Sequence, residues 1–171
     1  FQWRSFEPRA FRYLQMEFRW CGKPVAIDYV RVSENRYPVE SSGSFDCSDP
    51  VLNDIWKARV NTTLACMQDI FLDSPRLERA QWWGDARILS RAAYYLFGDT
   101  ALLASGLNQF ARAQKQDGSI PGLYPSGHEK MVPDFALMWV FSVLDYYAFS
   151  KDAALVADLY PSVRGLMEWF L

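Results

Sequence analysis

Three carboxylates and two tryptophans fall within the thirteen residues of the segment DSPRLERAQWWGD, which spans positions 73–85. They are Asp73, Glu78, Trp82, Trp83 and Asp85. Cleaving a glycosidic bond needs one carboxylic acid that protonates the leaving oxygen and a second carboxylate that activates water or attacks the anomeric carbon. Further carboxylates can hold sugar hydroxyls and, by like-charge repulsion, keep the acid protonated near neutral pH. Because tryptophan faces also stack on sugar rings or bases, the combination favours a carbohydrate ligand.

The start of this segment predicts a loop rather than a helix. Pro75 disfavours helical geometry at Ser74, and helical patterns lie on both sides of the segment. A loop fixed at both ends by helices can turn several side chains toward one point. We therefore predict that the three carboxylates and at least one tryptophan border a common hollow open to solvent, shared with the loop at residues 117–134. Weaker candidates in that second loop are Asp117, Tyr124, Glu129 and Asp134.

Each of these residues also has an ordinary structural role open to it. Asp85 can cap the helix that follows, and both tryptophans can belong to the core. Glu78 can pair with Arg76 or Arg79 on the surface. His128, the only histidine, lies in the second loop, where a solvated or structural role is more typical than catalysis.

Downstream of Asp49 the apolar residues recur three or four positions apart, which is typical of helices. Asp49 with Pro50 forms a helix-start signal, Gly98 predicts the end of a helix, and Asp99 can cap the next one. The apolar stripes cover residues 52–71, 88–96, 103–110, 135–149 and 155–170. The fourth of these is apolar nearly all round, so we expect it to be covered on most sides. Short links alternating with long loops suggest antiparallel helical hairpins.

Residues 1–44 carry a different pattern. Leu14, Met16, Phe18 and Trp20 alternate with polar residues, and this period of two predicts a half-buried antiparallel strand. Shorter extended pieces follow before the Ser-Ser-Gly sequence that ends at position 43. The sequence therefore predicts a few strands in residues 1–44 and a helical domain in residues 45–171.

Composition narrows the classes of function. Half of the residues are hydrophobic and the formal net charge is −2 without a lysine or arginine run, which argues against nucleic acid or an anionic membrane as partner. No apolar run approaches the ~20 residues of a membrane span. The three cysteines lack the close Cys/His spacing of a zinc site, so neither a disulfide framework nor a metal site is indicated. We expect a neutral ligand and no cofactor.

The segment DSPRLERAQWWGDA resembles the signature of the bacterial α-L-rhamnosidase family of glycoside hydrolases. The positions that fit are Asp73, Pro75, Glu78, Gly84, Asp85 and Ala86. Trp82 has the better spacing for the family's tryptophan, whereas Leu77 stands where the family has an arginine, flanked by Arg76 and Arg79. The resemblance continues through FDCSDPVLNDIW before the segment and DGSIPGLYPSGHEKMVPDFALMWV after it.

This resemblance implies a mainly α fold: an incomplete (α/α)6 barrel, a toroid of helical hairpins, preceded by a few antiparallel strands of a β-sandwich. Residues 1–44 would be the last strands of the sandwich and residues 45–171 the N-terminal part of the catalytic domain. The implied activity is hydrolysis of terminal α-L-rhamnose by an inverting acid/base mechanism without a cofactor. The family's scheme makes Glu78 the general acid and Asp73 and Asp85 binders of rhamnose hydroxyls, with a general base beyond Leu171.

Trp82, Trp83 and Arg79 complete the set of candidate substrate contacts. The alternatives are a carbohydrate-binding helical domain without catalysis, a glycosidase for another sugar, and a helical scaffold without a ligand. The last of these predicts that both tryptophans are fully buried and that the carboxylates are dispersed.

Overall fold

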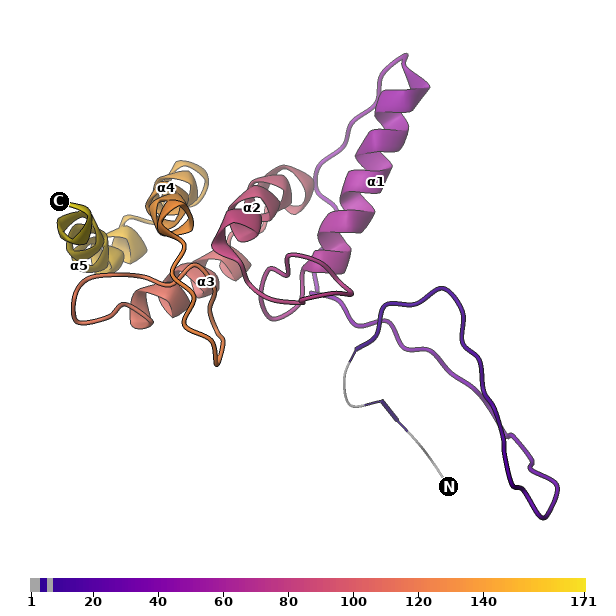
Figure 1. Cartoon of the computed structure of the whole chain (residues 1–171). Helices are drawn as coiled ribbons and strands as arrows, with labels where there is room; N and C mark the ends of the chain where they lie inside the picture. Colours follow the sequence, from indigo (N-terminus) through magenta and orange to yellow (C-terminus); the bar gives the residue numbers. More distant parts are fainter. Residues whose placement is uncertain (1–3, 6–7) are drawn as a thin grey trace. The chain divides into compact units, whose positions relative to one another are not determined.

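The computed structural model describes residues 4–5 and 8–171. Within this part of the chain five α-helices follow one another, and the segments between them are loops (Figure 1). The helices are α1 (Pro50–Cys66), α2 (Trp83–Phe97), α3 (Ala101–Arg112), α4 (Pro133–Ser150) and α5 (Ala153–Phe170). Each of the five predicted helical stripes therefore corresponds to a helix. None of these helices is sufficiently long and apolar to cross a membrane.

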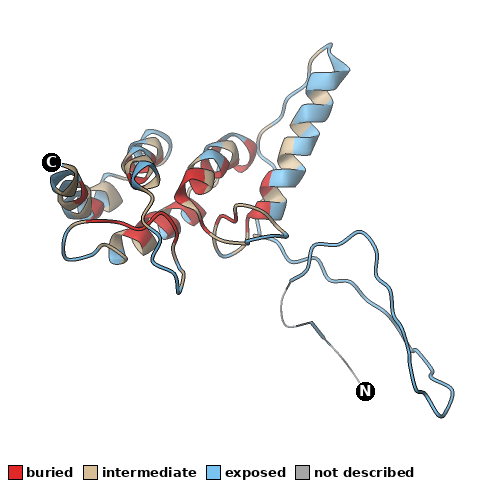
Figure 2. Cartoon of the chain, viewed as in Figure 1, coloured by how far each residue is buried: buried red, intermediate tan, exposed pale blue. Residues whose placement is uncertain are grey.

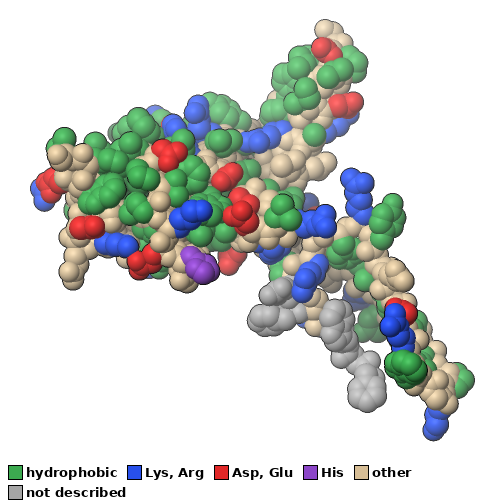
Figure 3. Space-filling view, in the orientation of Figure 1, with side chains coloured by type: hydrophobic (Ala, Val, Ile, Leu, Met, Phe, Trp, Pro, Cys, Tyr) green, Lys and Arg blue, Asp and Glu red, His purple; other side chains and the backbone are tan. Residues whose placement is uncertain are grey.

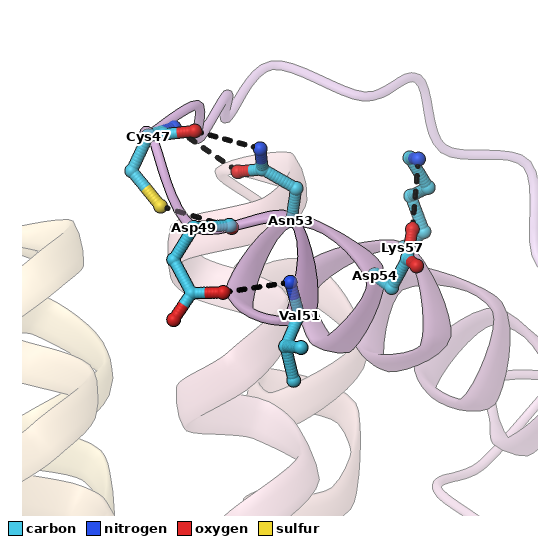
Figure 4. A network of polar contacts seen from close by, with 6 residues as sticks. All are labelled: Cys47, Asp49, Val51, Asn53, Asp54 and Lys57. Atoms are coloured by element: carbon cyan, nitrogen blue, oxygen red, sulfur yellow. Dashed lines mark hydrogen bonds and ion pairs between the residues drawn. The ribbon is translucent and has the colours of Figure 1, made fainter.

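The predicted start of α1 is confirmed by its hydrogen bonds (Figure 4). The Asp49 side chain accepts a bond from the Val51 amide at 2.9 Å, and Pro50 occupies the first turn. Asn53 adds a second brace, because its side chain accepts from the Cys47 amide at 3.0 Å and donates to the Cys47 carbonyl at 2.8 Å. The bond from Asp49 satisfies an amide that a helix start leaves without an intrahelical partner, and the bonds of Asn53 tie the preceding residue Cys47 to the helix.

The end of α1 differs from the predicted stripe, which ran on to Phe71. The helix ends at Cys66, and Met67 takes an extended conformation that forms an isolated bridge with Phe71. The Leu72 amide then donates to the Cys66 carbonyl at 2.8 Å. Met67 and Phe71 are fully buried, so the apolar pattern beyond Cys66 reflects a tight turn packed into the core rather than a further helical turn.

Other local signals act as expected. Gly98 ends α2 in the left-handed conformation that glycine adopts without steric cost, with φ of 66°. Asp99 accepts a hydrogen bond from the Leu102 amide at 3.2 Å and so caps the start of α3. Asp152 does the same for the amides of Ala154 and Leu155 at the start of α5.

The core lies where α2 and α3 pack against their neighbours. α2 packs on α1 and α4, and α3 packs on α4 and α5. In Figure 2 the buried residues, coloured red, gather on α2, α3 and the adjoining end of α1. The largest of them are Trp83, Trp139, Phe71 and Phe110. A half-buried ion pair between Arg87 and Asp145, at 3.1 Å, also joins α2 to α4.

The prediction of strands in residues 1–44 is wrong for the residues that the structure describes, because none of them lies in a strand. An extended segment becomes a strand only when its backbone pairs with a neighbouring segment. The alternation of residues 14–20 indicates which side chains share a face, but it does not supply such a partner. Figure 2 shows this segment as exposed, and Trp20 is 98% exposed.

Contacts divide the chain into residues 1–35 and residues 36–171. Residues 36–43 pack with the helical unit: the Tyr37 amide donates to the Met67 carbonyl at 3.1 Å, and the amides of Ser42 and Gly43 donate to the Leu96 carbonyl. Gly43 allows this approach, since a Cβ there would lie 1.9 Å from the Tyr95 carbonyl oxygen. The domain boundary between residues 44 and 45 stays a prediction.

The apolar helix α4 is covered on one side by the described helices, and cover of its other sides stays a prediction. Its buried residues include Ala136, Trp139, Val143 and Tyr146, which face the other helices. Exposed apolar side chains on α4 are Phe141, Leu144, Tyr147 and Phe149. The described helices pack against one face only, and green side chains are correspondingly visible over the helical part in Figure 3.

Substitution of two glycines, Gly118 and Gly127, tests how the loop at residues 117–134 packs against α5. Gly118 has φ of 92°, and a Cβ there would lie 2.4 Å from the Gly165 carbonyl oxygen in α5. Gly118→Ala should therefore lower the free energy of unfolding by about 1–3 kcal/mol, measured by urea denaturation. Gly127→Ala in the same loop is the control, because its Cβ would meet nothing within 4 Å. Equal stability of the two variants would contradict this packing.

Candidate active site

The segment between α1 and α2 is a loop, as its sequence predicted. Two hydrogen bonds between Asp73 and Ala80 close the loop. The Asp73 amide donates to the Ala80 carbonyl at 2.9 Å, and the Ala80 amide donates to Asp73 Oδ1 at 2.8 Å. Ser74 Oγ accepts from the Leu77 amide at 3.3 Å, which turns the chain inside the loop. One oxygen of the Asp73 carboxylate therefore holds the shape of the loop while the side chain stays half-buried.

Arg79 braces the same loop from within. Its backbone is left-handed, with φ of 53°, a conformation that non-glycine residues seldom adopt. Its Nη1 donates to the Pro75 carbonyl and its Nη2 to Gln68 Oε1, both at 3.0 Å. The guanidinium is thus engaged by the loop and by the turn after α1, and a contact of Arg79 with substrate stays a prediction.

Gln81 is a structural residue that the sequence reasoning missed. Its side chain is 1% exposed. The oxygen accepts from the Phe71 amide at 3.4 Å, and the nitrogen donates to Gln109 Oε1 in α3 and to the Tyr124 carbonyl, both at 2.9 Å. A glutamine between an alanine and a tryptophan carries no local signal of this role, because its partners are distant in sequence.

The loop at residues 117–134 lies directly against the first loop. The Trp83 amide donates to the Gly122 carbonyl at 3.0 Å, and the Tyr124 amide donates to the Gln81 carbonyl at 3.4 Å. These bonds surround an isolated antiparallel bridge between Trp82 and Leu123. The two loops that the sequence singled out are therefore joined along their backbones. That the side chains border one solvent-open hollow stays a prediction.

The adjacent tryptophans have opposite environments. Trp83 is fully buried; its indole nitrogen donates to Ser142 Oγ at 3.0 Å, and its ring lies 4.5 Å from that of Phe110. Such a side chain belongs to the core, so the prediction that Trp83 contacts substrate finds no support in its position. Trp82 is half-buried, and its indole nitrogen donates to Glu78 Oε2 at 2.6 Å.

The electrostatics of Asp85 depend on burial and on the other two carboxylates of the first loop. Asp85 stands in the first turn of α2, and burial of its side chain raises the pKa of its carboxyl above the usual range. The negative charges of Asp73 and, more weakly, Glu78 raise that pKa further. Asp85 is half-buried, and Glu78, although exposed, lies within electrostatic reach of it.

The polar residues of the second loop have largely local roles. Asp117 accepts hydrogen bonds from the amide and hydroxyl of Ser119, and these bonds lower the pKa of its carboxyl. Glu129 pairs with Lys115 at 2.6 Å, and His128 is exposed. Lys130 differs, because its ammonium lies 5.1 Å from the centre of the Trp82 ring. Lys130 is a second residue that the sequence reasoning did not single out.

Comparison with known proteins identifies the family to which the chain belongs. The family model described as the bacterial alpha-L-rhamnosidase 6 hairpin glycosidase domain matches residues 40–171, which is more than half of the chain. The chain belongs to this family. The matched residues include all five described helices, both loops and residues 42–43, whose amides donate to the Leu96 carbonyl of α2.

Individual relatives agree with the assignment to the six-hairpin glycosidase family. The chain is 24% identical to an alpha-L-rhamnosidase of Formosa agariphila over 98% of its own length and 19% of that protein. A crystal structure of a GH78 family rhamnosidase of Bacillus sp. GL1 is 32% identical with a TM-score of 0.74, over 77% of this chain and 14% of that one. A rhamnosidase from Klebsiella oxytoca with rhamnose bound is 26% identical with a TM-score of 0.68, over 80% and 26%. The chain thus spans about a fifth of the curated relative's length.

The raised pKa of Asp85 predicts a pH dependence of stability. A carboxyl whose pKa is higher in the folded than in the unfolded protein favours folding while it is protonated, and this contribution is lost as the pH rises through the folded pKa. The stability of Asp85→Asn relative to the natural protein should therefore increase between about pH 4 and about pH 7. Urea unfolding at both pH values measures this difference. A relative stability that falls with rising pH would show that the fold favours the ionised carboxylate.

Proposed function

We propose that the protein is an α-L-rhamnosidase that removes terminal α-L-rhamnose by an inverting acid/base mechanism. The observation that carries this proposal is the arrangement of the first loop. The charges of Asp73 and Glu78 lie close enough to Asp85 to raise the pKa of its carboxyl. The half-buried Trp82 donates a hydrogen bond to Glu78. Membership of the six-hairpin glycosidase family and the rhamnose-bound Klebsiella relative support rhamnose as the sugar.

In this proposal Glu78 is the general acid. Its exposed side chain can reach the oxygen of a leaving group, and protonating that oxygen lowers the barrier to breaking the bond. A second carboxylate, which we place in another part of the protein, activates the water that attacks the anomeric carbon from the opposite face. The described helices form part of the ring of hairpins that holds both groups.

Asp73 and Asp85 act as binders of sugar hydroxyls. Each ionised carboxylate is an acceptor of charge-assisted hydrogen bonds, which are stronger than bonds between neutral groups. Asp73 Oδ1 is held by the Ala80 amide, so the loop fixes the direction of this carboxylate. Asp85 is fixed by the first turn of α2. Fixed acceptors of this kind orient a sugar ring at little entropic cost.

Substitution of Glu78 separates chemistry from binding. In the complete protein Glu78→Gln should reduce kcat on a rhamnoside with a poor leaving group by about 10²–10⁴-fold, because an amide has no labile proton to give. The loss should shrink on an activated aryl rhamnoside, whose leaving oxygen needs less protonation. Steady-state kinetics on both substrates measure the two effects.

Asp73→Asn is the comparison within the same loop. It should raise KM as well as reduce kcat, on both substrates alike, since it weakens hydrogen bonds to hydroxyls that every rhamnoside shares. Full activity of Glu78→Gln on the unactivated substrate, or an equal loss on both leaving groups, would assign Glu78 to binding instead of proton donation.

A further inference from the structure

The indole of Trp82 connects the two loops through its side chain. Its nitrogen donates to Glu78 Oε2 at 2.6 Å across one turn of the first loop. The Lys130 ammonium lies 5.1 Å from the centroid of the Trp82 ring, which is within the range of a cation–π contact. The Phe135 ring of α4 meets it edge-on, with centroids 6.2 Å apart and an angle of 78° between the planes.

The hydrogen bond to Glu78 has a consequence for proton transfer. An indole nitrogen donates and cannot accept, so the oxygen that it contacts serves as an acceptor. When Glu78 is protonated, its carbonyl oxygen is the better acceptor, so this bond favours Oε1 as the oxygen that carries the proton. The bond also restrains an exposed side chain that has several freely rotating torsions. The bond thereby leaves Oε1 as the oxygen that the indole does not engage.

The position of the indole is in turn set by the second loop and α4. The Lys130 carbonyl accepts from the Gly122 amide at 2.9 Å, which fixes the chain on which the ammonium is carried. Phe135 can approach because Gly84 has no side chain: a Cβ at Gly84 would lie 2.5 Å from the Phe135 ring. The ring contacts of Trp82 therefore come from the second loop and α4, not from the loop that carries Glu78.

We propose that Trp82 is a positioning residue that orients the carboxyl of Glu78 for proton donation, and that Lys130 acts through the Trp82 ring. For its kinetic consequence this inference rests on the proposed function. It differs from a role of Trp82 as a stacking face for the sugar, because stacking requires the ring whereas positioning requires the indole N–H.

The test is a double-mutant cycle in the complete protein. Trp82→Phe keeps an aromatic face and removes the N–H. It should reduce kcat on an unactivated rhamnoside about 10- to 100-fold, a part of the general-acid effect, and change the activated aryl rhamnoside less than about threefold, with KM nearly constant. In the Glu78→Gln background the same substitution should cost almost nothing further, because no proton donor remains to be oriented.

Lys130→Met provides a second variant that leaves the indole in place. It should produce a smaller loss with the same dependence on the leaving group, and this loss should also vanish in the Glu78→Gln background. Lys151→Met is the matched control. The Lys151 ammonium lies 6.0 Å from the centre of the Tyr147 ring, at the C-terminal end of α4, so the substitution removes a comparable cation–π contact that does not involve Trp82. It should leave kcat unchanged on both substrates.

The outcomes separate the inference from the function on which it rests. If Glu78→Gln shows no dependence on the leaving group, Glu78 is not the general acid, and the part of the proposed function on which this inference rests fails. If Glu78→Gln shows that dependence but Trp82→Phe reduces both substrates equally, or adds its full loss to that of Glu78→Gln, Trp82 acts by stacking or by folding and the positioning role is overturned.

Discussion

The buried amide of Gln81 is the contact on which the rest of the site depends. It is bonded to the turn after α1, to Gln109 of α3 and to the carbonyl of Tyr124 in the second loop. A buried amide that lost these partners would carry a desolvation cost of about 1–3 kcal/mol, so the three segments are held in one arrangement. α3 can approach because Gly106 has no side chain: a Cβ there would lie 3.1 Å from Gln81 Oε1.

Two neighbouring residues, Trp82 and Trp83, lie in different environments, and this difference positions the acidic residues of the candidate site. Trp82 is the last extended residue before α2 and remains half-buried next to Glu78, whereas Trp83 begins the helix and enters the core. Burying Trp83 against Phe110 anchors the start of α2 and with it Asp85. The candidate site is therefore built at the point where a rigid helix meets a closed loop, which fixes acidic groups while leaving one of them exposed.

Local signals were sufficient to predict the helices. Asp49 with Pro50, Gly98 and Asp99 act through neighbouring residues, so their effect can be read from the sequence. The site depended on contacts between distant segments, which periodicity does not encode. For this reason Gln81 and Lys130 were missed, and Trp82 was separated from Trp83 only by their burial. The strands expected in residues 1–44 failed for a related reason, since alternation predicts a face but not a pairing partner.

The central claim is that the first and second loops together hold one rhamnose beside Glu78. A crystal structure of the complete protein with rhamnose measures this most directly. The account predicts a sugar ring between the two loops, with hydroxyls within hydrogen-bond distance of the Asp73 and Asp85 carboxylates and with Glu78 facing the anomeric oxygen while its other oxygen stays bonded to the Trp82 indole. Rhamnose bound away from these loops, or bound there with Glu78 turned away from the anomeric centre, would contradict it.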